Sequence, residues 1–123
     1  MNCLYLFDNM FIITNFKNVL SKAEFYSKNR GFDKTILVLC INSAIYFFEN
    51  KEYELVLFFI DKAKLSNNYN IYLRERIILK YIELVVSFKI GKIGRNSMES
   101  FIQGLKLIGE DELIEELKKI YQL

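Results

Sequence analysis

Apolar residues recur along this chain at a spacing close to 3.6 residues, which is the period of an α-helix. Alternation with a period of two, the mark of a half-buried strand, is nearly absent, so the pattern predicts about seven helices. In order, the expected helices cover Leu4–Phe16, Lys17–Lys28, Lys34–Phe48, Tyr53–Leu65, Ile71–Ile90, Met98–Ile108 and Asp111–Tyr121. No linker rich in Pro, Gly or Ser divides the sequence, so residues 1–123 are expected to form one domain.

Residues typical of helix ends stand between these segments. Gly31 and Gly109 are expected to end helices, because glycine accepts the left-handed conformation found there. Asp33 and Ser97 are expected to cap the N-termini of the helices that follow them. The later turns of Ile71–Ile90 are apolar on most sides, which is typical of a helix in the centre of a packed array.

The segment 39–65 carries much of the pattern of a tetratricopeptide hairpin, two short antiparallel helices folded on each other. A small residue, Ala44, precedes Phe47 by three positions. Tyr53 opens the second helix, and Ala63 closes it. Three positions depart from the consensus: Val56, Ile60 and Asn68.

Pairs of helices recur about 40 residues apart, near the spacing of helical repeats. The expected fold is therefore all-α, with antiparallel helix pairs stacked as a short tetratricopeptide-like solenoid. An irregular helical bundle is the alternative.

Composition narrows the function. Hydrophobic residues make up 52% of the chain, enough for a real core, and the net charge of +2 is too small to indicate nucleic acid or an anionic membrane. The absence of histidine excludes imidazole acid–base chemistry and histidine metal sites. Cys3 and Cys40 fit no metal-ligand spacing and indicate small buried hydrophobes in a reducing, cytoplasmic setting. No cofactor, metal, membrane span or signal peptide is expected.

Asn42 is the leading candidate for a binding residue. It lies in the middle of a helix otherwise filled by apolar side chains, where an unpaired amide would be costly to bury. Its side chain both donates and accepts hydrogen bonds, as a peptide unit does. In tetratricopeptide hairpins this position tends to face the concave groove. The alternative is a core asparagine bonded to a neighbouring helix.

Other charged residues have plain structural explanations beside functional ones. Glu83 lies in an apolar part of its helix and is expected to pair with Lys80 or Lys89, or to mark a solvated edge. Arg74 and Arg76 have the fork geometry to hold a ligand carboxylate, or are ordinary charge at a helix start.

Four segments follow one another in an order that resembles a known family: LYLFDNMFIITNF, VLCINSAIYFFENKEYELVLFFIDKAK, VVSFKIGK and MESFIQGLKLIGEDELIEELKK. They are similar to the C-terminal regulatory region of Rgg/MutR-type transcriptional regulators of Gram-positive bacteria. The resemblance implies an all-helical, tetratricopeptide-like domain that binds a short signalling peptide, dimerises, and follows a helix-turn-helix that reads DNA. No helix-turn-helix precedes these helices here, so DNA binding by these residues themselves is not expected.

The sequence thus predicts a cytoplasmic, peptide-sensing regulatory domain, with a helical-repeat scaffold or oligomerisation domain as the alternative and an enzyme not expected. A groove around Asn42 would favour the peptide-sensing domain. A concave side that is flat because side chains fill it would favour the scaffold. The predicted peptide-binding residues are Asn42, Val38, Ile45, Glu49, Arg74, Arg76, Tyr81, Val85 and Phe88. The predicted homodimer interface comprises Ile114, Leu117 and Tyr121.

Overall fold

The computed structural model describes residues 34–66 and 69–122, and these residues form five α-helices without a strand. The prediction of an all-α fold is therefore confirmed for this part of the chain. The first two expected helices and the Asp33 cap lie outside the described residues. The helices are α2 (Thr35–Glu49), α3 (Tyr53–Lys64), α4 (Leu73–Lys89), α5 (Arg95–Leu107) and α6 (Asp111–Ile120).

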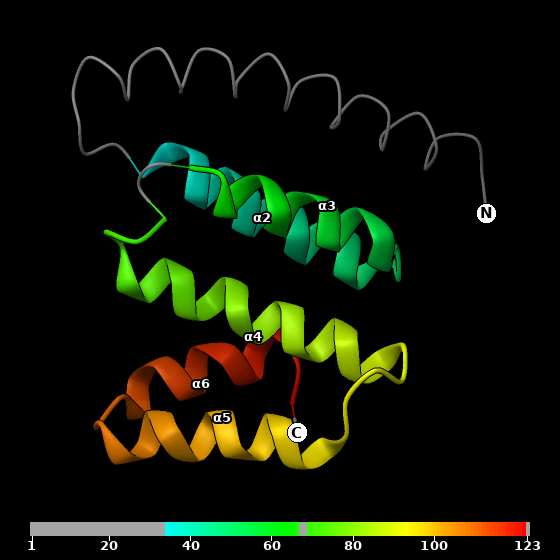
Figure 1. Ribbon diagram of the computed structural model, residues 1–123. Coiled ribbons are helices and arrows are strands. Elements are labelled where there is room, and N and C mark those ends of the chain that lie inside the picture. The colour runs from blue at the N-terminus through cyan, green and yellow to red at the C-terminus, as the bar shows by residue number, and fades with distance from the viewer. Residues whose placement is uncertain (1–33, 67–68, 123) are drawn as a thin grey trace.

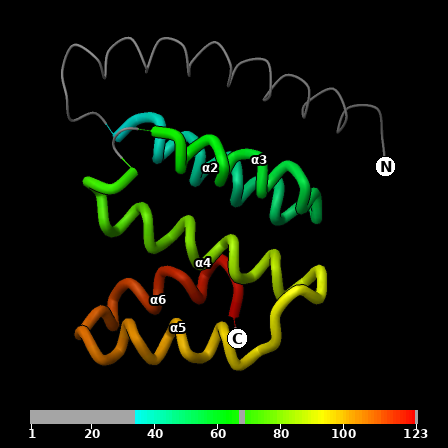
Figure 2. Tube along the Cα trace, in the orientation of Figure 1, coloured from blue at the N-terminus to red at the C-terminus, as the bar shows by residue number. Residues whose placement is uncertain are grey.

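The helices are arranged around α4 (Figure 1). α2 and α3 form an antiparallel pair on one side of α4, and α5 and α6 lie on its other side, as the chain trace in Figure 2 also shows. α4 is the one helix of the described part that packs against all four others. The expected central position of this apolar helix is therefore confirmed, whereas a regular solenoid repeat stays a prediction.

Three helices end in the same hydrogen-bonded turn, in which a residue of positive φ follows the helix. Gly91 and Gly109 take this position with φ of 82°, as the sequence predicts for Gly109, and Lys51 takes it with φ of 60°. At the end of α2, the amides of Lys51 and Glu52 donate to the carbonyls of Phe48 and Phe47. This is the Schellman arrangement, which satisfies carbonyls that the end of a helix leaves open.

Helix α5 begins three residues earlier than expected, so the prediction that Ser97 caps it is wrong. Gly94 is the N-cap residue, and its carbonyl already accepts a hydrogen bond of 3.2 Å from the Ser97 amide. Ser97 therefore lies inside the first turn. α4 begins two residues later than expected, and the remaining described ends agree to within one residue.

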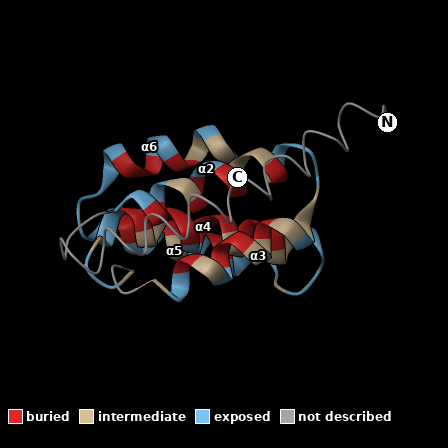
Figure 3. Ribbon diagram, turned by 90° about the horizontal axis from the view of Figure 1, so that it is seen from above, coloured by how far each residue is buried: buried red, intermediate tan, exposed pale blue. Residues whose placement is uncertain are grey.

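α2 and α3 make the most extensive helix–helix contact of the described residues, and a small residue is buried in each helix. Ala44 and Ala63 are fully buried, and the rings of Phe47 and Phe59 stack with centroids 5.4 Å apart and planes 10° from parallel. Figure 3 shows the buried face of each helix turned inward. Ala44 and Phe47, both part of the hairpin pattern in the sequence, are buried at this contact, and Cys40 is a buried hydrophobe as expected.

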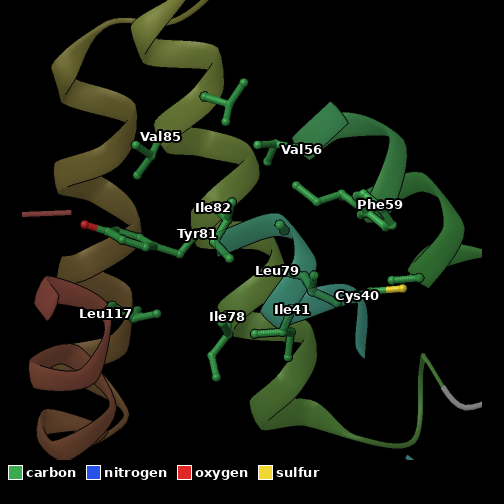
Figure 4. Packing of buried hydrophobic residues seen from close by; sticks show 14 of the residues in the cluster. Cys40, Ile41, Val56, Phe59, Ile78, Leu79, Tyr81, Ile82, Val85 and Leu117 are labelled. Atoms are coloured by element: carbon green, nitrogen blue, oxygen red, sulfur yellow. The ribbon is translucent and has the colours of Figure 1, made fainter. Parts of the chain in front are cut away.

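α4 supplies the centre of the same core. Figure 4 shows Leu79 and Ile82 among residues of α2 and α3, while Tyr81 and Val85 extend toward the α5 and α6 side. Both Tyr81 and Val85 are fully buried. α4 thus joins the two halves of the described fold through opposite faces of one helix.

Candidate functional site

The outer face of α2 carries the predicted stripe around Asn42. Val38, Asn42, Ile45 and Glu49 follow at intervals of three or four residues, so they lie on one side of the helix. Asn42 and Glu49 are exposed, Val38 is 38% exposed, and Ile45 is half-buried. The alternative of a core asparagine is wrong, because Asn42 faces outward from the α2–α3 core.

A pocket of about 370 Å³ lies on the N-terminal half of this face. A cavity of this size falls in the lower part of the range for small-ligand sites, about 300–1,000 Å³. Val38 and Leu39 give it apolar walls, and polar groups of Lys34, Thr35 and Asn42 stand around them. Such a combination can bury an apolar side chain while holding a polar group of the same ligand.

Sequence reasoning missed Lys34, Thr35 and Leu39 as members of this site. The signal was helical periodicity, because Lys34, Thr35 and Leu39 lie eight, seven and three positions before Asn42, spacings that place side chains on the same side of a helix. Lys34 stands at the start of α2 and forms a 3.5 Å ion pair with Glu75, whose carboxylate is buried at the start of α4.

The structure does not bring Arg74 or Arg76 to the pocket. Arg74 pairs with Glu116 of α6 and lies 3.9 Å from Glu75. Arg76 donates hydrogen bonds of 3.1 and 3.4 Å to the backbone carbonyl and the side-chain oxygen of Asn70. Both guanidinium groups are therefore engaged within the described chain.

The three residues predicted from the later turns of α4 also lie elsewhere. Tyr81 and Val85 are fully buried, Phe88 is half-buried, and the pocket lining includes none of them. Tyr81 stacks on Phe101 of α5 with ring centroids 6.1 Å apart. Burial raises the pKa of the Tyr81 phenol, and nearby Tyr121 adds to that effect.

The predicted dimer residues contact the rest of this chain. Ile114 and Leu117 are buried with exposed fractions of 3% and 0%, and Tyr121 is half-buried. The hydroxyl of Tyr81 donates a hydrogen bond to the backbone carbonyl of Tyr121. The fold thus brings together two residues to which the sequence assigned different roles.

Glu83 has a structural explanation. Its carboxylate accepts hydrogen bonds of 2.5 Å from Lys64 and 3.2 Å from Lys80, which confirms the predicted pairing with Lys80. Burial acts to raise the pKa of Glu83, but the bonds from Lys64 and Lys80 outweigh it, and the pKa is lowered. Glu83 is absent from the lining of the α2 pocket and ties α3 to α4.

Within the described ranges, none of the helices combines the length and the apolar character needed to cross a bilayer. Over residues 1–119 the chain matches a family model described as "HTH-type transcriptional regulator Rgg, C-terminal domain". Neither the curated proteins nor the solved structures contain a match.

Proposed function

The chain belongs to the Rgg C-terminal domain family and is thus a regulatory domain of a transcriptional regulator, and we propose that it senses a short apolar peptide on the outer face of α2. This proposal rests on one observation: the exposed side-chain amide of Asn42 lies beside the apolar walls of a pocket. In this proposal the pocket takes up one or two apolar side chains of the peptide. Asn42 bonds the peptide backbone, because an amide side chain matches both the donor and the acceptor of a peptide unit.

Lys34 is the cation that we assign to the terminal carboxylate of the ligand. It lines the pocket, whereas Arg74 and Arg76 are engaged with partners of their own. The Lys34 side chain is 56% exposed, and its nitrogen lies 3.5 Å from the Glu75 carboxylate, longer than a typical charge-assisted hydrogen bond, so a ligand carboxylate can exchange for Glu75. This assignment fixes the direction of the bound peptide, whose carboxyl end would lie near the start of α2.

The pocket favours the sensor over the scaffold alternative, because a scaffold needs no concave apolar site beside an exposed amide. The same proposal includes neither catalysis nor a cofactor. DNA would be read by a helix-turn-helix outside residues 1–123, and the site of action would be the cytoplasm, where the DNA of a bacterium lies.

A labelled library of apolar hexapeptides tests the proposal. A peptide selected on the wild-type protein should bind Asn42→Ala about 5-fold to 150-fold more weakly, since an unpaired buried polar group costs about 1–3 kcal/mol. Gln103→Ala, an exposed amide on α5, is the matched control and should bind as the wild type does. Normal binding by Asn42→Ala, or no peptide selected by the wild type, would contradict the assignment.

We also propose that two copies pair at the end of α5. Ile114 and Leu117 are buried within the chain, whereas the neighbouring Leu107 and Ile108 are 87% and 65% exposed. Large apolar side chains exposed to this extent are favourable contacts for a second copy. Sedimentation should show a dimer at tens of micromolar that Leu107→Ser weakens, and a strictly monomeric wild type would contradict this.

A further inference from the structure

Tyr121 leaves helix α6 and returns to the middle of the fold. Its backbone is extended, with φ of −156° and ψ of 122°, although its amide still bonds the carbonyl of Leu117. Figure 1 draws this end of the chain in red, close to α4. Tyr121 is thus an extended residue whose side chain and carbonyl are free of the α6 helical pattern.

Its partners come from two other helices. Phe48 of α2 meets the Tyr121 ring nearly edge-on, with centroids 6.1 Å apart and planes at 76°. The ammonium nitrogen of Lys89, on α4, lies 4.7 Å from the centroid of the same ring. The hydroxyl of Tyr81, also on α4, donates to the Tyr121 carbonyl.

These three contacts recognise general features of an extended peptide. An edge-on aromatic contact and a cation near the ring select an aromatic side chain. The phenol of Tyr81 bonds a backbone carbonyl, which every residue carries. Phe48, Tyr81 and Lys89 together therefore present one side-chain contact surface and one main-chain donor, a combination that peptide-binding sites use.

Phe48, Tyr81 and Lys89, called the cradle below, also lie where another peptide segment can replace Tyr121. Phe48 and Tyr121 are half-buried and Lys89 is exposed, so Tyr121 can leave without opening the α2–α3 core. Lys89 has no ion pair within the described chain, since the salt bridges there involve other lysines. Tyr81 alone would be left with an unpaired buried hydroxyl, and another peptide carbonyl would satisfy it.

We propose that Phe48, Tyr81 and Lys89 form a binding site for an extended peptide segment with an aromatic side chain, which Tyr121 occupies as an internal competitor. A ligand of this class displaces Tyr121 and so releases the end of α6 from α2 and α4. The site is separate from the pocket at Lys34–Asn42, because Phe48 lies at the other end of α2. It therefore does not depend on the function proposed above.

A peptide with the sequence of residues 118–123, Lys-Lys-Ile-Tyr-Gln-Leu, is the probe for this site. Fluorescence polarisation of the labelled peptide should show at least tenfold tighter binding to Tyr121→Ala than to the wild type, whose cradle is filled. Adding Tyr81→Phe to that variant should weaken binding about 3-fold to 10-fold, the effect of one lost hydrogen bond. A probe with alanine in place of tyrosine should not bind. Equal binding to wild type and Tyr121→Ala, or no binding to either, would overturn the proposal.

A second measurement follows the internal occupant directly. The chain has no tryptophan, so Tyr121→Trp supplies a single indole reporter. Its emission should be blue-shifted in the folded protein and should move to the red when an excess of unlabelled probe peptide is added. An emission typical of an indole in water before any addition, or one that excess probe does not move, would overturn the proposal. Asn42→Ala should leave both readouts unchanged, so a failure of the α2 pocket would be seen separately.

Discussion

The ammonium group of Lys64, at the end of α3, donates a 2.5 Å hydrogen bond to Glu83 in the middle of α4. Lys80 donates to the other carboxylate oxygen at 3.2 Å. The Glu83 side chain is only 19% exposed, so the two lysines act on a carboxylate partly shielded from water. This pairing gives the α3–α4 contact a polar anchor that depends on the charge of Glu83.

Glu83→Gln should therefore lower the free energy of unfolding near neutral pH. The pKa of Glu83 is lowered in the folded state, so its contribution is present above the unfolded pKa and is lost as the pH falls through the folded pKa. The loss should be about 1 kcal/mol or less, because the Lys64 and Lys80 side chains are themselves 41% and 50% exposed. Urea unfolding of both proteins at several pH values measures this. A difference that stays constant into the acid range would contradict the ionic origin.

Lys51→Gly should stabilise the protein by about 0.5–1 kcal/mol. Lys51 has a positive φ of 60°, where a β-carbon is strained and glycine is not. The gain is reduced because glycine gives the unfolded chain more freedom. Gly109→Ala is the converse control, since it places a side chain at φ of 82°, and it should destabilise. Chemical denaturation measures the free energy of unfolding of each variant. A loss of stability in Lys51→Gly would show that the contacts of the lysine side chain outweigh the strain in its backbone.

Phe47→Ala should cost about 3–5 kcal/mol of unfolding free energy, the range for removing a large buried aromatic side chain. Phe47 is fully buried and stacked on Phe59. Phe58→Ala is a matched control one position along α3 from that stack, where the ring is half-buried, and its cost should be clearly smaller. Thermal melts followed by circular dichroism compare the two, and similar costs would contradict the described packing.

Cys40 should react with thiol reagents only through unfolding. The thiol is fully buried, and burial raises its pKa to about 12, so almost no thiolate forms at neutral pH. In a Cys3→Ser background, the rate of labelling by a disulfide reagent should follow the rate of unfolding and rise steeply with denaturant. Fast labelling of the native protein would contradict the burial of Cys40.

Several local features of the fold could be read from the sequence because they depend on neighbouring residues. Periodicity located all five described helices, and Gly109 marked the end of α5, since helix ends follow from backbone conformation. The pattern around Ala44 and Phe47 identified α2 and α3 as an antiparallel pair (Figure 1). The prediction that Ser97 caps α5 was wrong, because Gly94 serves as the N-cap and the helix begins directly after it.

Only part of the candidate site could be predicted from the sequence. The stripe of Val38, Asn42 and Glu49 was predictable, because residues on one face of one helix have a fixed spacing. The sequence could not place Tyr81, because an apolar helix in the centre has a buried residue on almost every side. Only packing decided which neighbour each side chain met.

By itself, the sequence determined the helical class, the glycine at the end of α5, the shared side of the α2 stripe and the family of the chain. Tertiary structure decided that Arg74 pairs with Glu116, and that Tyr81 bonds the carbonyl of Tyr121. Residues so far apart along the chain meet only when whole helices dock. That docking depends on the shapes of complete helix faces, which no local pattern of hydrophobic and polar positions specifies.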